Sequence, residues 1–287
     1  MSDLQTLVAE PWADWALLDC GNGEKLERYG NVTVVRPEPQ AMWKPALDQW
    51  DPDATFVPGS DEEGGGRWVQ HRDVPPQWEL TRGKVRFHAS LTPFRHLGFF
   101  PDMAPQWDWM RMRAGDSDIL NLFGYTGVGT LQLSDAGARL VHVDASKKSV
   151  EAGRDNARVS GLEDRPIRWI VDDATKFTAR EVRRARRYDG ILLDPPKFGR
   201  GPDGEIWRLE EHLAPLLADC RRLLDSESRF LVLTVYAVRM SALAIGELVR
   251  QTFAELGGRV EVGEMAVRED ARGLLLPTAI FARWSGD

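Results

Sequence analysis

A turn rich in glycine lies within the stretch Leu120-Asn121-Leu122-Phe123-Gly124-Tyr125-Thr126-Gly127-Val128-Gly129-Thr130. A short apolar strand precedes this turn, a helix start follows it, and a second apolar run, Leu140–Val143, ends in Asp144. This order is typical of a nucleotide-binding βαβ unit, whose glycines permit positive φ angles and whose helix N-terminus favours an anionic group. The pattern predicts an α/β fold. It leaves the nucleotide open, because Gly124 and Asp144 stand about 20 residues apart, as in NAD-binding sites.

Two further apolar runs also end in acidic residues. Ile167–Val171 reads as the next strand and ends at Asp172-Asp173, and Tyr188–Leu193 ends at Asp194. Because parallel strands end at the same edge of an α/β sheet, these acids and Asp144 would line one crevice. Such a crevice suits a ligand with ribose hydroxyls, an adenine amino group and a cation. S-adenosylmethionine has all three, and its sulfonium would be stabilised by nearby carboxylates.

A double proline follows the strand that ends at Leu193, in Asp194-Pro195-Pro196-Lys197-Phe198. Pro195 and Pro196 have a fixed φ and no N–H, so they end the strand and hold a rigid turn. Asp194 is therefore a carboxylate that a stiff backbone places at the mouth of the expected site. The alternative is an aspartate that only caps a turn before proline.

From about Phe87 to its end, the chain resembles the bacterial class I S-adenosylmethionine-dependent rRNA methyltransferases of the RlmI-like and RlmK-like group. The resemblance covers roughly two thirds of the chain, and its motifs stand in the expected order. They are Gly98-Phe99-Phe100-x-Asp102, Asn121–Gly127, Val143-Asp144-Ala145-Ser146, Asn156, Asp172-Asp173 and Asp194–Phe198.

The resemblance implies a Rossmann-like sheet of seven strands with a smaller β-rich N-terminal domain. It also implies that S-adenosylmethionine is the methyl donor and S-adenosylhomocysteine the product. In such enzymes the glycine turn holds the methionine part, Asp144 the ribose and Asp173 the adenine amino group, while Asp194 and Pro195 lie beside the transferred methyl. The expected cofactor-binding residues are Asn121, Phe123, Gly124, Tyr125, Thr126, Gly127, Asp144, Ala145, Ser146, Asn156, Asp172, Asp173 and Asp194. The expected catalytic residues are Asp194, Pro195, Pro196 and Lys197.

Turn clusters and periodicity divide the chain into three parts. We expect a β-rich domain over 1–90 (for substrate recognition or as a lid), a connecting segment with a helix over 91–117, and the methyltransferase domain over 118–287. Gly199–Gly204 is expected to be a mobile substrate loop. The predicted later elements are a helix at Leu209–Leu224, a strand at Arg229–Tyr236, a helix at Ser241–Leu256 and two strands at Val260–Val267 and Pro277–Trp284.

The charge of the chain is unevenly distributed. Residues 1–63 carry a net charge of −9 and the whole chain −7, so the remainder is +2. Contact with RNA must therefore be local, and residues 67–95 combine six basic side chains with four aromatic ones, Trp68, Trp78, Phe87 and Phe94. The alternative, which the sequence favours, is a β-rich module whose aromatic side chains form its core.

The target atom is constrained by the cysteines. Methylation of cytosine C5 needs a thiolate nucleophile, and RlmI-like enzymes carry a cysteine just after the fifth strand. Here that segment, Leu233–Val238, has none, and Cys220 lies in a predicted buried helical stripe. A nucleobase nitrogen is the expected acceptor, since Asp-Pro-Pro turns serve exocyclic amino groups. Lys197 stands where those turns carry an aromatic residue, which here is Phe198.

The remaining expectations concern compartment, metal and partners. The start of the chain lacks a basic, apolar signal segment and no run approaches about 18 apolar residues, so we expect a cytoplasmic protein without a membrane partner. Two cysteines and five histidines without ligand spacing predict no metal. The expected partner is rRNA or a ribosomal precursor, with a monomer and a dimer both open. A small-molecule or protein methyltransferase, a cytosine C5 enzyme, a catalytically silent cofactor-binding protein and an NAD oxidoreductase are the alternatives.

Overall fold

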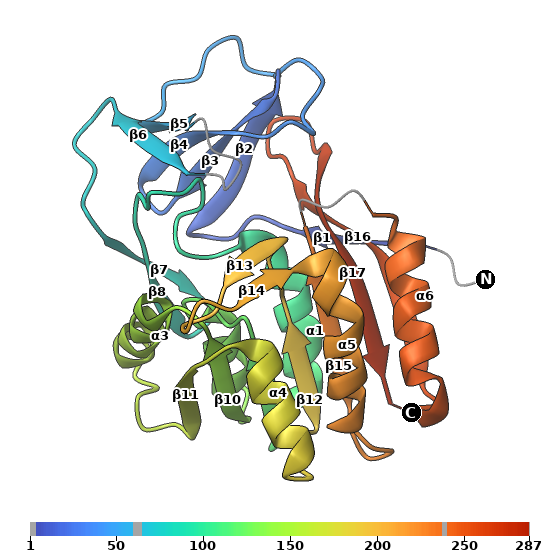
Figure 1. Cartoon of the computed structure of the whole chain (residues 1–287). Coiled ribbons are helices and arrows are strands. Elements are labelled where there is room, and N and C mark those ends of the chain that lie inside the picture. Colours follow the sequence, from blue (N-terminus) through green and yellow to red (C-terminus); the bar gives the residue numbers. More distant parts are fainter. Residues whose placement is uncertain (1–3, 60–64, 237–239, 287) are drawn as a thin grey trace. The chain divides into compact units, whose positions relative to one another are not determined.

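The chain forms two compact units (Figure 1). The computed structural model describes residues 4–59, 65–236 and 240–286. Unit 1 comprises Met1–Leu7, Pro105–Met265 and Ala279–Asp287, and unit 2 comprises Val8–Ala104 and Ala266–Thr278. The predicted boundaries at 90 and 118 cut the chain into consecutive parts, whereas each unit here combines separate segments.

Most of unit 1 is built on an eight-stranded sheet with the strand order β1-β16-β17-β15-β12-β9-β10-β11, and the ends of β1, β16 and β17 belong to unit 2. The strands are β1 (Gln5–Ala9), β9 (Asp118–Leu122), β10 (Arg139–Asp144), β11 (Ile167–Val171), β12 (Gly190–Leu193), β15 (Phe230–Val235), β16 (Arg259–Arg268) and β17 (Leu275–Ser285). Strands β9 to β12 and β15 pair in parallel, and β17 runs antiparallel to β15. The predicted methyltransferase-type α/β sheet is confirmed. Its eighth strand was not predicted, because β1 pairs with a segment at the opposite end of the chain.

Alternating side chains place a core on each face of this sheet. Leu120 of β9 and Leu231 of β15 belong to one buried cluster, which also contains Leu217 of α5. Helices α4, α5 and α6 lie in a row along this face (Figure 1). Phe230, the neighbour of Leu231, meets Trp109 of α1 instead, with ring centroids 5.8 Å apart. The helices of unit 1 are α1 (Ala104–Ala114), α2 (Val128–Asp135), α3 (Lys147–Val159), α4 (Ala174–Arg183), α5 (Leu209–Arg222) and α6 (Ala242–Phe253).

Unit 2 is rich in β structure, as predicted. Its strands are β2 (Trp15–Gly21), β3 (Glu24–Tyr29), β4 (Val32–Pro37), β5 (Ala54–Pro58) and β6 (Gly66–Gln70) in one sheet, and β7 (Trp78–Arg82) and β8 (Val85–Ala89) in a ribbon. Strand β3 carries little strand signal of its own, because charged residues dominate its sequence. Its Glu27 is nevertheless buried, where it accepts a hydrogen bond of 2.7 Å from Nε of Arg36.

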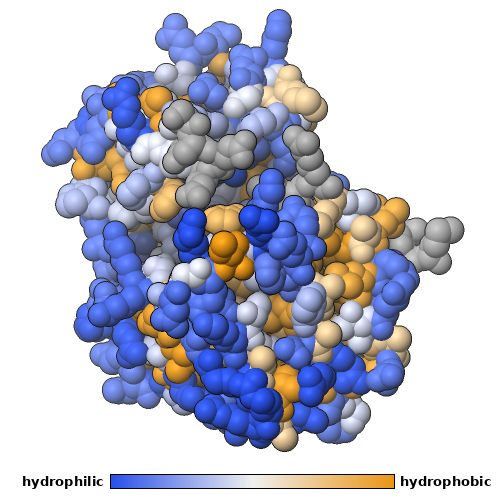
Figure 2. Space-filling view, in the orientation of Figure 1, coloured by the Kyte–Doolittle hydropathy of each residue, from blue (hydrophilic) through white to orange (hydrophobic). Residues whose placement is uncertain are grey.

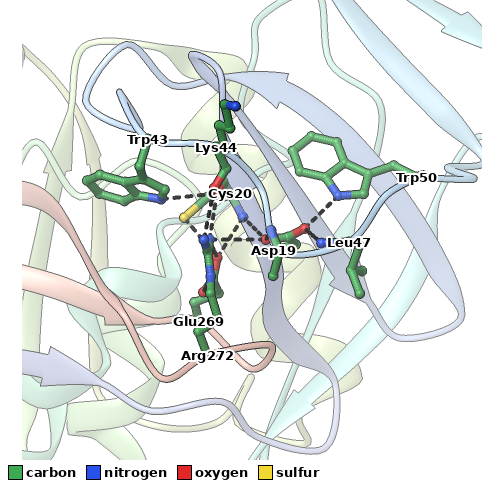
Figure 3. Close-up of polar contacts among 9 residues, drawn as sticks. Asp19, Cys20, Trp43, Lys44, Leu47, Trp50, Glu269 and Arg272 are labelled. Carbon is green, nitrogen blue, oxygen red and sulfur yellow. Dashed lines mark hydrogen bonds and ion pairs between the residues drawn. The ribbon is translucent and has the colours of Figure 1, made fainter.

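Buried charges join the two segments of unit 2 (Figure 3). The carboxylates of Asp19 and Glu269 are both fully buried. Nη2 of Arg272 lies 2.5 Å from Oε1 of Glu269 and 3.3 Å from Oδ1 of Asp19. Trp50 donates its indole N–H to Asp19 over 2.9 Å. Since a buried carboxylate is costly without a partner, Arg272 holds the segment Ala266–Thr278 against β2.

Candidate functional site

The glycine turn and the acidic residues emerge at one edge of the unit 1 sheet. Leu122, the last residue of β9, is in register with Val143 of β10 and with Leu193 of β12. The next residues along these strands therefore leave the sheet at the same level. The chain continues from β11 to β12 on the other side of β9, so this edge is a topological switch point, where α/β sheets bind ligands.

The glycine turn is held in a strained conformation. Phe123 has a φ of 58° and Tyr125 a φ of 49°, in the left-handed region that side chains other than glycine rarely adopt. Gly124 lies between them, and a Cβ there would approach Cε1 of His142 to 2.4 Å. Gly127 ends the turn with a φ of 79°. Backbone strain of this kind concentrates at ligand sites.

Helix α2 begins directly after this turn. Its N-cap residue is Gly127, which provides no side-chain hydrogen bond to the first turn of the helix. The backbone N–H groups there are therefore available to an anionic ligand group, such as the carboxylate of an amino acid.

Asp144 connects the turn to the end of β10. Its Oδ2 accepts a hydrogen bond of 2.8 Å from the backbone N–H of Tyr125, and its Oδ1 accepts one of 2.8 Å from that of Ser146. Burial raises the pKa of Asp144, while these two backbone donors oppose the rise. Ala145 lies between Asp144 and Ser146 in the chain and is half-buried. A partly buried carboxylate with fixed orientation is suited to accept hydrogen bonds from a diol.

A buried polar chain supports the glycine turn from below. Nδ2 of Asn121 donates to Oγ1 of Thr130 over 2.8 Å, and this hydroxyl lies 2.9 Å from Nδ1 of His142. All three side chains are buried, and burial lowers the pKa of His142 to about 3. Because Thr130 accepts from Asn121, its own proton is available to Nδ1 of a neutral imidazole. The structure thus places Asn121 beneath the turn.

Asn156 of α3 holds the glycine turn at Thr126. Its Nδ2 donates to the carbonyl of Thr126 over 2.9 Å, and its side chain is buried. The ring of Trp169 on β11 packs closely here, since a Cβ at Gly127 would lie 3.0 Å from it. The turn therefore has a rigid floor made by two strands and a helix.

The two acids after β11 have separate partners. Asp172 pairs with Arg180. Asp173 is the N-cap of α4 and accepts from the backbone N–H of Lys176 over 2.9 Å. Asp173 is buried and Asp172 half-buried. Of the two, Asp172 stands directly after the strand and Asp173 one residue further on.

The turn at Asp194 is fixed by a tryptophan from a later segment. Nε1 of Trp207 donates to the carbonyl of Pro196 over 2.6 Å, and the Trp207 ring lies 4.9 Å from that of Phe123, centroid to centroid. Trp207 thus links the Asp-Pro-Pro turn to the glycine turn. Lys197, which follows the prolines, is exposed.

The segment after Lys197 is ordered as an antiparallel ribbon. Strands β13 (Phe198–Arg200) and β14 (Ile206–Arg208) pair with each other, and Gly199 is opposite Trp207. The predicted loop over Gly199–Gly204 is therefore wrong for Gly199 and Arg200, which belong to β13, and its mobility stays a prediction. The ribbon forms because Trp207 buries its ring and donates a hydrogen bond to the carbonyl of Pro196. A run of glycines and polar residues gives no sign of these contacts in the sequence.

Neither cysteine of the chain has the setting of a nucleophile. Cys220 is fully buried in α5, and burial raises its pKa. Burial and a hydrogen bond to Glu269 raise the pKa of Cys20, in unit 2, to about 12. Both thiols therefore stay protonated at neutral pH.

In the part of the chain that the structure describes, no three His, Cys, Asp or Glu side chains are grouped so that they could hold a metal ion. No described helix is both long enough and apolar enough to cross a membrane.

Three residues that organise this edge were not identified from the sequence, namely Thr130, His142 and Trp207. Thr130 and His142 sit within a helix and a strand, where they read as ordinary core positions. Trp207 lies in a short polar segment. Their roles arise from contacts between elements, for which a single sequence gives no local signal.

Comparison with known proteins identifies one family and several relatives. Residues 62–225 match the family described as S-adenosylmethionine-dependent methyltransferase. A crystal structure of a SAM-dependent methyltransferase from Agrobacterium tumefaciens is 42% identical, covers 100% of this chain and 98% of its own, and has a TM-score of 0.92. A second solved structure, with SAH bound, has a TM-score of 0.75 at 14% identity over 95% of this chain and 75% of its own, and shows the same fold.

Several curated relatives carry the name ribosomal RNA large subunit methyltransferase I. The protein of Alteromonas mediterranea is 25% identical over 61% of this chain and 48% of its own length. That of Aeromonas salmonicida is 30% identical over 55% of this chain and 37% of its own. The chain thus spans about half, or less, of the length of the curated relatives it matches.

Proposed function

We propose, since the chain belongs to the family of S-adenosylmethionine-dependent methyltransferases, that it methylates a nucleobase nitrogen in large-subunit ribosomal RNA. The methyltransferase family and its cofactor are the premise, and the acceptor is the proposal. The names of the curated relatives support an RNA acceptor. The observation that carries the choice of nitrogen is the rigid Asp194-Pro195-Pro196 turn beside the glycine turn, together with the buried state of both thiols.

The edge of the unit 1 sheet fits the cofactor in the chemistry of its donors. S-adenosylmethionine supplies a methyl group on a positively charged sulfur. We assign its amino-acid part to the turn Phe123–Gly127 and the uncapped start of α2, where N–H groups meet a carboxylate. We assign its ribose to Asp144 with Ala145 and Ser146, and its adenine to Asp172 and Asp173.

Two of the expected cofactor residues have positioning roles in this proposal. Asn121 donates to Thr130 and Asn156 donates to the carbonyl of Thr126, so both amides are engaged with the protein. They would keep the turn in its strained conformation and save the cofactor the cost of ordering it.

The acceptor amino group is assigned to Asp194 and the carbonyl of Pro195. The carbonyl of Pro196 already accepts the indole N–H of Trp207, which leaves that of Pro195 as the proline carbonyl for this role. Two acceptors that bind the amino hydrogens direct the nitrogen lone pair toward the methyl group. The rate gain would come mainly from this alignment. Lys197, exposed beside the turn, is assigned to a phosphate of the RNA.

A carbon acceptor is disfavoured by the thiols. Attack on C6 of cytosine requires a thiolate, and burial keeps both thiols of this chain protonated. A nitrogen acceptor needs only hydrogen-bond acceptors, which the Asp194 turn provides. A cytoplasmic location follows from an rRNA substrate and is part of the proposal.

The test is transfer of a labelled methyl group from S-adenosylmethionine to ribosomal RNA from a strain that lacks the gene. Wild-type protein should label the RNA, and Asp194→Ala should lose roughly 100-fold or more in rate while it still binds the cofactor. Asp164→Ala, which removes an exposed carboxylate before β11, is the matched control and should label RNA at the wild-type rate. Label found only in protein or small-molecule fractions would refute the proposal.

A further inference from the structure

The ribbon β13–β14 is fastened to the sheet edge by one of its faces. Gly199 and Trp207 are opposite each other on this inner face, and Trp207 is buried against Phe123. The backbone N–H of Leu209 donates to the carbonyl of Lys197 over 3.0 Å, which closes the base of the ribbon. The ribbon is therefore fixed at the Asp194 turn.

The outer face of the same ribbon is exposed and combines apolar with basic side chains. Side chains alternate across a strand, so Phe198, Arg200, Ile206 and Arg208 all lie opposite to the Trp207 face. Phe198 is 38% exposed and Ile206 49% exposed. Hydrophobic residues flanked by hydrophilic ones are visible over the region of β13 and β14 (Figure 2).

An aromatic ring and a guanidinium group lie together on this face. The Cζ atom of Arg200 lies 5.8 Å from the centroid of the Phe198 ring. A ring and a guanidinium plane are the two side-chain groups on which nucleobases stack irrespective of sequence, and a guanidinium also binds phosphate. Exposed large apolar groups on an otherwise polar surface mark sites of interaction.

The distribution of ion pairs leaves positive charge on the outer face. Glu205 and Asp203, the acids of the ribbon, both lie against Lys176 of α4. Arg208 pairs with Glu211 over 3.1 Å. Among the residues that the structure describes, Arg200 of this face forms no ion pair, so its charge is available to an anion. In a chain of net charge −7, such a local cationic face complements a polyanion.

We propose that the outer face of the β13–β14 ribbon, formed by Phe198, Arg200, Ile206 and Arg208, is a docking surface for single-stranded RNA. A base stacks on Phe198 and against Ile206, and Arg200 binds the adjacent phosphate. The proposal rests on the proposed function, because RNA is the substrate whose approach to Asp194 it explains. The rigid attachment through Trp207 sets the distance between the docked nucleotide and the reacting one.

The test measures RNA binding and methyl transfer separately. The probe for binding is ribosomal RNA from a strain that lacks the gene, with affinity measured over a series of salt concentrations. Phe198→Ala should weaken binding roughly ten-fold or more at every salt concentration and leave the salt slope unchanged. Arg200→Ala should weaken binding and reduce the slope of log affinity against log salt by about 0.7 to 1.

Conservative variants and a matched control distinguish a specific loss of RNA binding from a loss caused by unfolding. Phe198→Trp and Arg200→Lys should retain the aromatic surface and the salt slope, respectively, and so bind close to wild type. The double variant Leu243→Ala/Arg222→Ala removes an exposed apolar and an exposed basic residue from α6 and α5, and should bind RNA like the wild type. All variants should bind S-adenosylmethionine with unchanged affinity.

The outcomes separate this inference from the proposed function. If wild-type protein methylates RNA but Phe198→Ala and Arg200→Ala bind and react like the wild type, the docking surface is refuted and the function stands. If the variants lose affinity for the cofactor instead of RNA, the ribbon is a cofactor cover and the inference is also refuted. If wild-type protein binds RNA through this face without methylating it, the proposed function fails while the docking surface stands. Binding of a ribosomal protein, and not of RNA, to this face would overturn the inference.

Discussion

The hydroxyl of Thr130 lies 2.9 Å from Nδ1 of His142, and the imidazole of this histidine lies directly beneath Gly124. The strained glycine turn therefore rests on a neutral, buried ring whose orientation is fixed by a hydrogen bond. This arrangement makes His142 a positioning residue for the cofactor turn. Its protonation would introduce a charge into a buried site, and burial opposes that charge more strongly than the nearby backbone group of Tyr125 favours it.

His142→Gln tests this role through pH. Burial lowers the pKa of His142 to about 3, below its value in the unfolded chain, so the unfolded state takes up a proton first as pH falls. The stability that the neutral ring contributes is complete above about pH 6.5 and is lost as pH falls toward 3. The destabilisation caused by His142→Gln should therefore shrink by about 1–2 kcal/mol between about pH 7 and pH 5.

Denaturant unfolding at both pH values measures this difference. Val143→Ala, a substitution of a buried neighbour on β10 that removes no titratable group, should cost the same free energy at each pH. A deficit of His142→Gln that does not change with pH would show that the imidazole is not held neutral.

Gly124→Ala should disturb the turn by steric contact alone. A Cβ would stand 2.4 Å from Cε1 of His142, so either the turn or the ring must move, and we expect cofactor affinity to fall roughly ten-fold or more. Calorimetric titration with S-adenosylmethionine measures this. In a His142→Ala background the same substitution should cost less, which a double-mutant cycle detects. Gly199→Ala, where a Cβ would lie at an ordinary 3.4 Å from Pro196, is the control and should bind the cofactor normally.

Trp207→Phe should separate catalysis from cofactor binding. The variant keeps a ring beside Phe123 but loses the hydrogen bond of 2.6 Å to the carbonyl of Pro196. The Asp194 turn would then be less well oriented, and we expect kcat to fall roughly ten-fold, about 1.4 kcal/mol in the barrier, with little change in the Kd of S-adenosylmethionine. Steady-state rates with labelled cofactor and a separate binding titration give the two quantities. A weaker Kd at unchanged kcat would contradict the assignment.

Arg272→Met addresses the stability of unit 2. The carboxylates of Asp19 and Glu269 are buried and both contact this guanidinium, so its removal should lower the free energy of unfolding by about 2 kcal/mol or more. Thermal and denaturant unfolding measure the loss. Arg268→Met, which removes an exposed pair with Glu10 in the same unit, should cost well under that amount. Equal losses in the two variants would show that burial of the carboxylates does not determine how much Arg272 contributes to stability.

Much of unit 1 follows from local sequence patterns. Apolar runs bounded by glycines, acids and prolines marked β9 to β12. The helix expected within residues 91–117 is α1, and the predicted helix Leu209–Leu224 closely matches α5. These elements are predictable because each carries its own periodicity and its own end signals. Several strands escaped prediction, β1 and β3 among them. The first depends on a partner at the other end of the chain, and the second is highly charged yet buried through the pair Glu27–Arg36.

The site could be predicted as a set of residues but not as a set of contacts. The edge where the Asp144, Asp172 and Asp194 segments emerge was expected from strand order, and the sheet has that order. The sequence did not reveal that Asn121 points to Thr130 or that Trp207 fixes Pro196, because these contacts join elements that are distant along the chain. The direct cofactor and catalytic roles of the individual residues stay predictions.

The central claim is that this methyltransferase modifies a nucleobase nitrogen in large-subunit rRNA, and the identity of the methylated nucleoside tests it most directly. Purified protein is incubated with labelled S-adenosylmethionine and ribosomal RNA or subunits from a strain that lacks the gene, and the RNA is digested to nucleosides for mass spectrometry. We predict a labelled adenosine or guanosine that carries the methyl group on a base nitrogen and is absent with Asp194→Ala. Labelled 5-methylcytidine, or no labelled nucleoside despite intact cofactor binding, would contradict the account.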